Sequence, residues 1–86
     1  MQADNIKYYM VTTKSLKLDK DIYNVLYNTT MSSVLSGKTI IGISLREIQA
    51  NETQNFYANV YVNGTEIRAV VNVAQYYLFK VAILYK

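Results

Sequence analysis

Residues 56–73 read FYANVYVNGTEIRAVVNV, and the fold prediction starts from this stretch. Asn63-Gly64 lies between two runs of alternating side chains, which is the strongest short-range signal for a β-hairpin. A type I′ turn at these two residues pairs Val60 with Ile67 and makes one face of the hairpin apolar. A slip by one residue would exchange the two faces, so the faces are well specified.

The second face of this hairpin is mixed and half polar. Its expected cross-strand pairs are Tyr61 with Glu66, Asn59 with Arg68, and Tyr57 with Val70. A face of this composition needs neither full burial nor full exposure, and it is the first place to look for a site.

The remaining elements are predicted from period and turn signals. Alternation with a period of two indicates strands over residues 5–13, 39–49 and 77–86. The first strand either extends or bends at 13–15, because its even-numbered face resumes at Leu16 and Leu18. Residues 69–86 also fit a helix in length, and that alternative stays open.

A helix is predicted for residues 20–28. Asp19 or Asp21 offers an N-cap, and a thin apolar stripe follows through Ile22 and Val25. The element order β-α-β-β-β-β then gives an α+β fold. In it, an antiparallel sheet of about five strands carries one helix on one face, and residues 1–86 form a single small domain.

Composition excludes several classes of protein. An apolar fraction of 51% with 17% charged residues excludes a disordered chain. Cysteine, histidine and proline are absent, which removes disulfides, thiolate metal sites and the commonest general base. The polar start and the lack of a long apolar run predict neither a signal peptide nor a membrane span, hence a cytoplasmic protein.

No catalytic, cofactor or metal constellation emerges from the residues. Ser36-Gly37-Lys38-Thr39 resembles the end of a phosphate-binding loop, but Ser32 stands where that loop needs a glycine. Asp19 and Asp21, the only closely spaced carboxylates before Glu47, suit helix capping better than a metal shell. We therefore expect a protein that is not an enzyme.

Tyrosines near cations form the candidate binding surface. Tyrosine is the commonest aromatic residue, with nine copies, and the net charge is +3. Rings and cations on a sheet are a common way to hold single-stranded nucleic acid. The candidate residues are Tyr57, Asn59, Tyr61, Arg68, Tyr9, Lys7 and Lys80. Nucleic-acid binding is accordingly the alternative function.

Protein–protein interaction is the preferred function. Both sheet faces carry large side chains and one helix covers only one of them, so an uncovered face or edge favours association, most simply as a homodimer. The partner beyond a second copy is an unknown protein. The usage, rich in Tyr, Ile and Asn, is similar to that of small open reading frames of viruses and mobile elements, which suggests an accessory protein acting on a host macromolecule.

Overall fold

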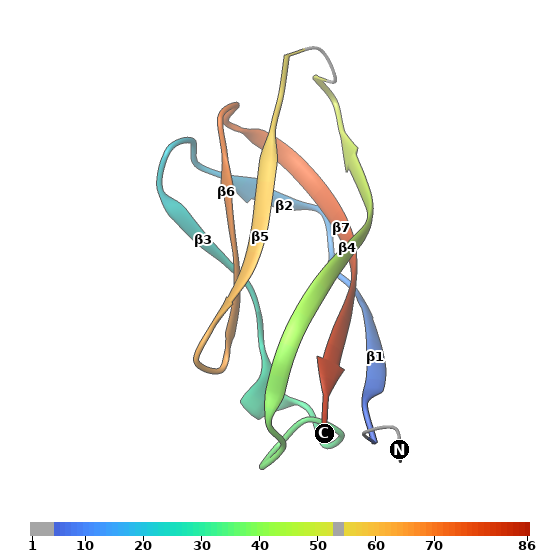
Figure 1. Ribbon diagram of the computed structural model, residues 1–86. Coiled ribbons are helices and arrows are strands. Elements are labelled where there is room, and N and C mark those ends of the chain that lie inside the picture. The colour runs from blue at the N-terminus through green and yellow to red at the C-terminus, as the bar shows by residue number, and fades with distance from the viewer. Residues whose placement is uncertain (1–4, 53–54) are drawn as a thin grey trace.

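The chain folds into two antiparallel β-sheets, which the computed structural model describes for residues 5–52 and 55–86 (Figure 1). The strands are β1 (Lys7–Thr12), β2 (Leu16–Leu18), β3 (Tyr23–Asn28), β4 (Ile40–Ala50), β5 (Ala58–Asn63), β6 (Glu66–Val71) and β7 (Gln75–Tyr85), with one 3₁₀ turn, η1 (Thr29–Met31). Part of the polar N-terminal start, residues 1–4, lies outside the described residues, as do residues 53–54 between β4 and β5.

Sheet A is built around β7. β4 pairs along one side of β7, while β1 and β2 pair end to end along its other side. In the lower half of Figure 1, β7 runs between β4 and β1. The predicted strand over 77–86 is confirmed, and residues 69–86 contain the end of β6 and all of β7, with no helix.

Sheet B has the order β3-β6-β5 and contains the predicted hairpin. Its pairing is shifted by two residues from the expectation, because Asn63 pairs with Glu66. Gly64 has a φ of 61° and Thr65 has no positive φ, which is the pattern of a type II′ turn with glycine in the first central position. A shift of two residues, unlike a shift of one, leaves every side chain on its predicted face.

The core lies between the inner faces of the two sheets, which form a sandwich. The most deeply buried apolar side chains of the central strands are Tyr77, Phe79, Val81 and Ile83 of β7, and Ile67, Ala69 and Val71 of β6. Each large one stabilises the fold by about 1.5–3 kcal/mol through its removal from water. Tyr77 stacks on Phe79 with 5.8 Å between ring centroids, and its hydroxyl donates to the Val73 carbonyl at 2.6 Å.

The α+β prediction is wrong, because residues 20–28 do not form a helix. Tyr23–Asn28 form β3 instead, which pairs with β6. Asp21 has a φ of 63° and donates its N–H to the Val71 carbonyl at 2.8 Å, so it is no helix cap. Aromatic and β-branched side chains such as Val25 suit a half-buried strand, and pairing with a distant strand outweighs a weak helical stripe. The described residues hold seven strands and no α-helix.

A bulge joins β1 to β2. Between the pairs that Thr12 and Leu16 make, three residues of this strand stand opposite two residues of β7. Thr13 closes the bulge: its N–H donates to the Phe79 carbonyl at 2.9 Å, and its hydroxyl accepts from the Phe79 N–H at 3.0 Å. The extra residue reverses the facing of side chains from one side of the bulge to the other.

This reversal decides which side of β1 faces the core. Val11 is buried and Tyr9 is half-buried against the core, whereas Tyr8 and Met10 point outward and are exposed. The odd-numbered face of β1 is therefore the inner face. Tyr9, one of the candidate binding residues, lies on this inner face.

Two side-chain amides fasten the connection between β4 and β5 to the start of β7. Gln75 accepts from the backbone N–H of Glu52 and donates to its carbonyl at 2.9 Å. The side chain of Asn72 accepts from the backbone N–H of Tyr57 at 2.7 Å and donates to the Asn55 carbonyl at 2.9 Å. Each amide thus satisfies one backbone N–H and one backbone carbonyl of this connection.

Candidate binding surfaces

Four of the predicted binding residues lie together on the outer face of sheet B. Tyr61 pairs with Arg68 across the β5–β6 hairpin, and Asn59 follows on the same face. Tyr57 precedes β5 and is exposed. Tyr23 of β3 joins them from the strand that was predicted as a helix. The outer face of sheet B therefore presents three tyrosines, of which Tyr23 and Tyr61 lie beside Arg68.

Arg68 is already occupied within this face. Its Nε donates to Glu66 Oε1 at 2.8 Å, its Nη2 lies 2.7 Å from the same oxygen, and its guanidinium carbon lies 4.0 Å from the ring centroid of Tyr23. The hydrogen bond that Arg68 donates to Glu66 raises the pKa of Arg68 above its ordinary value. The charge of Arg68 is thus balanced by a carboxylate two residues away on the same strand.

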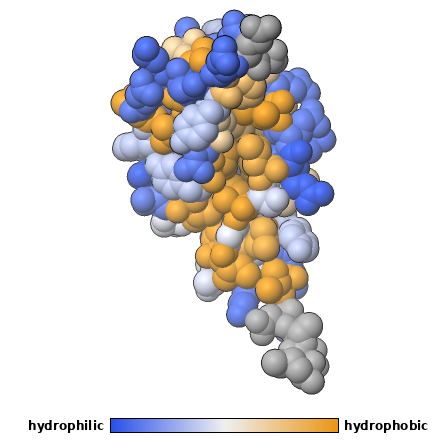
Figure 2. Space-filling model, turned by 45° about the horizontal axis from the view of Figure 1, so that its top comes forward, coloured by the Kyte–Doolittle hydropathy of each residue, from blue (hydrophilic) through white to orange (hydrophobic). Residues whose placement is uncertain are grey.

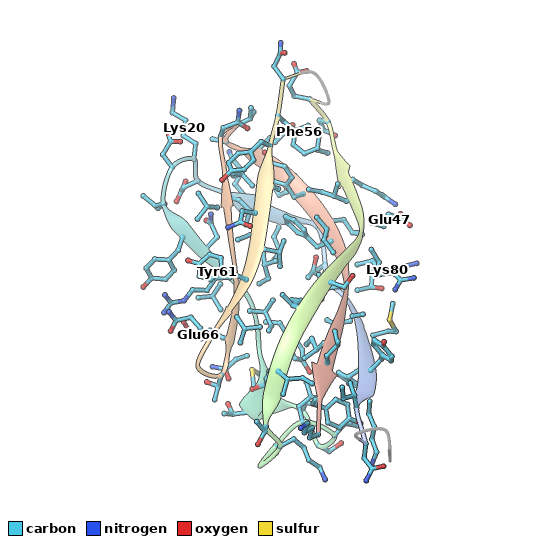
Figure 3. The ribbon with its side chains drawn as sticks, in the orientation of Figure 1. Lys20, Glu47, Phe56, Tyr61, Glu66 and Lys80 are labelled. Atoms are coloured by element: carbon cyan, nitrogen blue, oxygen red, sulfur yellow. The ribbon has the colours of Figure 1, made fainter. Side chains whose placement is uncertain are left out.

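The other three predicted residues belong to sheet A. Tyr9 packs against the core, and Lys7 lies exposed at the start of β1. Lys80 is on the outer face of sheet A, where its Nζ lies 3.9 Å from Glu47 Oε1. Figure 3 shows Glu47 and Lys80 on one side of the molecule and Tyr61 and Glu66 on the opposite side. The seven candidate residues therefore do not make one continuous surface.

The outer side of β1 carries a row of exposed apolar side chains that the candidate surface did not include. Ile6, Tyr8 and Met10 keep 42%, 64% and 51% of their accessible surface. They flank Leu84 and Ala82 of β7, which pair with Tyr8 and Met10. The alternation in the sequence places Ile6, Tyr8 and Met10 on one face of the strand. Nothing in the local sequence marks the bulge that makes this face the outer one.

A second apolar region lies where the two sheets meet at β4 and β5. These are edge strands of different sheets and they contact each other. On β4, Ile41 and Leu45 stay exposed, while Val60 and Val62 of β5 are half-buried. Figure 2 shows a hydrophobic band running down one side of the molecule between more polar margins. The surface therefore has apolar area well beyond scattered single residues.

A shallow pocket of about 280 Å³ opens beside the bulge of sheet A. Ser15, Gln49, Asn51 and Tyr76 supply its polar lining. Lys17 lies next to it, with its Nζ 5.8 Å from the ring centroid of Tyr76. Amides and hydroxyls can orient a small uncharged molecule, but the lining has no carboxylate or imidazole for proton transfer.

Metal-ligand geometry is not found within 5–52 and 55–86: no three acidic side chains of this part gather into a cluster. Asp19 instead pairs its backbone with the Asn24 side chain, N–H to Oδ1 at 3.1 Å and carbonyl to Nδ2 at 3.1 Å. Among the described residues, no helix has the length and apolar character to cross a membrane.

Comparisons with protein-family models, with curated proteins and with solved structures find no match for this chain.

Proposed function

We propose that this chain is a non-catalytic interaction protein that acts as a homodimer. The supporting observation is the exposed apolar row of Tyr8 and Met10 on the outer strand β1 and Ile6 just before it. Three large exposed apolar side chains in a row along one edge of a small domain form a patch of the kind that marks association surfaces. No α-helix of the described chain packs over this face, so a partner is the remaining cover.

The described polar groups favour binding over chemistry. The pocket beside the bulge offers amides and hydroxyls, and the most constrained ion pair, Glu66 with Arg68, holds two side chains of the sheet surface to each other. Groups arranged in this way recognise and position a partner; none is poised next to a second group that would activate it.

We propose in addition that the homodimer binds a further partner. The composition, rich in Tyr, Ile and Asn, suits an accessory protein of a virus or mobile element that blocks or recruits a host macromolecule. The second apolar region, at β4 and β5, leaves a surface for such a partner when β1 is occupied by the second copy.

Sedimentation equilibrium tests the homodimer. We expect the mass to rise with concentration from 9.9 kDa to twice that value, in the micromolar range. A species of 9.9 kDa at every concentration up to the solubility limit would overturn the proposal.

Nucleic-acid binding is the second candidate, favoured by Tyr23, Tyr57 and Tyr61 on the outer face of sheet B. The Glu66 partner of Arg68 works against it, because that carboxylate already balances the charge that a phosphate would need. The test is titration with single-stranded DNA and RNA at low salt. Affinity that falls steeply with salt, and is lost in Tyr57→Ala/Arg68→Ala, would support this candidate. No binding at low salt would exclude it.

A further inference from the structure

The edge strands of the two sheets are protected to very different degrees. The pairing of β4 has two register shifts and that of β3 has one, while β5 lies in contact with β4. β1 pairs with β7 over six consecutive residues without a shift, and no described strand lies on its other side. Bulges, prolines and covering elements are the means by which proteins keep edges from pairing. β1 has no bulge along this length and the chain has no proline, so its edge is able to accept another strand.

The backbone groups that point away from β7 can be assigned. Thr13 donates its N–H to the Phe79 carbonyl, and residues of an antiparallel pair alternate between bonded and non-bonded positions. The odd-numbered residues of β1 therefore bond to β7. The N–H and carbonyl groups of Tyr8, Met10 and Thr12 point to the open edge.

These three residues also carry their side chains on the outer face of sheet A. Tyr8 pairs with Leu84 and Met10 with Ala82, both on the outer side of β7. The same positions of one strand thus offer unpaired backbone groups at the edge and apolar side chains beside it. A strand that pairs here satisfies the backbone and covers the apolar row together.

The geometry points to β1 as the interface of the homodimer, with two copies of the strand pairing antiparallel about a two-fold axis at Met10. Tyr8 then pairs with Thr12 of the second copy, and Met10 pairs with itself. The two A sheets become one continuous sheet in the order β4-β7-β1-β1-β7-β4. This inference rests on the proposed homodimer and identifies its interface.

Close charge repulsion does not oppose a second copy at this edge. In this register Lys7 stands opposite Thr13 of the second copy, and Lys14 stands opposite Ile6. No cation faces a cation, although the chain carries a net charge of +3. The apolar row of one copy continues into the same row of the other, so the outer faces of the two A sheets form one continuous apolar surface.

Met10→Pro removes the outward N–H at the axis and no N–H that bonds to β7. Proline is tolerated on an edge strand when its nitrogen faces outward. We expect the variant to fold, as judged by circular dichroism, and to weaken the dimer on the order of a hundredfold or more in sedimentation, because hydrogen bonds are lost on both sides of the axis. An unchanged dimer would place the interface elsewhere and leave the proposed function standing.

Cysteine cross-linking tests the register without depending on proline. The chain has no cysteine of its own. Met10→Cys places two thiols at the axis with Cα atoms about 5.5 Å apart, which is within disulfide reach, whereas the Cα atoms in Tyr8→Cys lie roughly 13 Å apart. We expect oxidation to link Met10→Cys into a covalent dimer and to leave Tyr8→Cys unlinked.

Each outcome of the two experiments is decisive. A wild-type dimer with a cross-linked Met10→Cys variant supports the interface. A wild-type dimer in which Val25→Cys links as readily as Met10→Cys, or in which neither links, overturns the interface alone. A strictly monomeric wild type overturns both the interface and the homodimer. If that monomer binds, along the edge of β1, a peptide with the sequence of another β-strand, the edge serves a foreign partner instead.

Discussion

β1 and β3 are both six-residue strands at the edge of a sheet, and both carry exposed apolar side chains. They differ in what surrounds those side chains. On β3, Tyr23 lies under the guanidinium of Arg68, and the pairing with β6 is interrupted by a register shift. On β1, the described part of the chain supplies no such cover and the pairing is regular.

The contrast shows that exposed apolar area alone does not define an interface. Asn24 binds the backbone of Asp19 and donates to the Ala69 carbonyl at 3.3 Å, so its amide anchors β3 to the neighbouring turn and strand. β1 combines its apolar row with unshifted backbone groups, and this combination is what a second strand can recognise.

The largest effect is expected from Phe79→Ala, which removes the core beneath both edges. Phe79 is fully buried in the middle of β7, and its loss should cost about 3–5 kcal/mol of unfolding free energy. Urea denaturation measures this cost, and Tyr57→Ala is the exposed control, expected within about 0.5 kcal/mol of the wild type. Equal costs for the two variants would contradict the assignment of the core.

Asn24→Ala should release the anchor of β3. The variant loses the paired hydrogen bonds to Asp19, and we expect about 1–3 kcal/mol of destabilisation. Asn59→Ala, on the exposed side of β5, is the matched control with little expected effect. If Asn24→Ala also began to self-associate through β3, then the Asn24 hydrogen bonds, and not the register shift in the β3–β6 pairing, would be what keeps the β3 edge from pairing.

Gly42→Thr tests the other edge of sheet A. A Cβ at Gly42 meets nothing within 4 Å and the backbone needs no positive φ, so a β-branched residue should stabilise the fold by about 0.5–1 kcal/mol. Since Gly42 lies on β4, the dissociation constant of the homodimer should not change. A dimer weakened by this substitution would move the interface from β1 to β4.

Met10→Lys and Val25→Lys have the smallest expected effect on the monomer and the clearest difference in association. Both side chains are about half exposed, at 51% and 45%, so each change should alter unfolding free energy by no more than about 0.5 kcal/mol. Sedimentation should show dissociation for Met10→Lys alone. Equal dissociation in both variants would mean that general charge repulsion, and not the β1 edge, is being measured.

Sequence alone was sufficient for features that depend on alternation. The two faces of the β5–β6 hairpin were predicted correctly even though the turn is centred on Gly64-Thr65, because a shift of two residues preserves facing. The strand β7 and its buried odd-numbered residues follow from the same pattern.

The features that sequence missed depend on contacts between distant residues. β3 is a strand because β6 pairs with it, and a local helical stripe through Val25 could not reveal that. Tyr9 lies inward because of the bulge closed by Thr13, which has no glycine to mark it. Of the candidate surface, the group around Arg68 was found, but its neutralising partner Glu66 depended on side-chain conformation.

Amide hydrogen exchange at β1 distinguishes an open edge from an edge paired with a second copy. The N–H groups of Tyr9 and Val11 bond to β7 and should be protected at every protein concentration. The N–H groups of Tyr8, Met10 and Thr12 should exchange fast in dilute protein and become protected as the dimer forms. Fast exchange at these three amides in a solution that is mostly dimer would contradict the account.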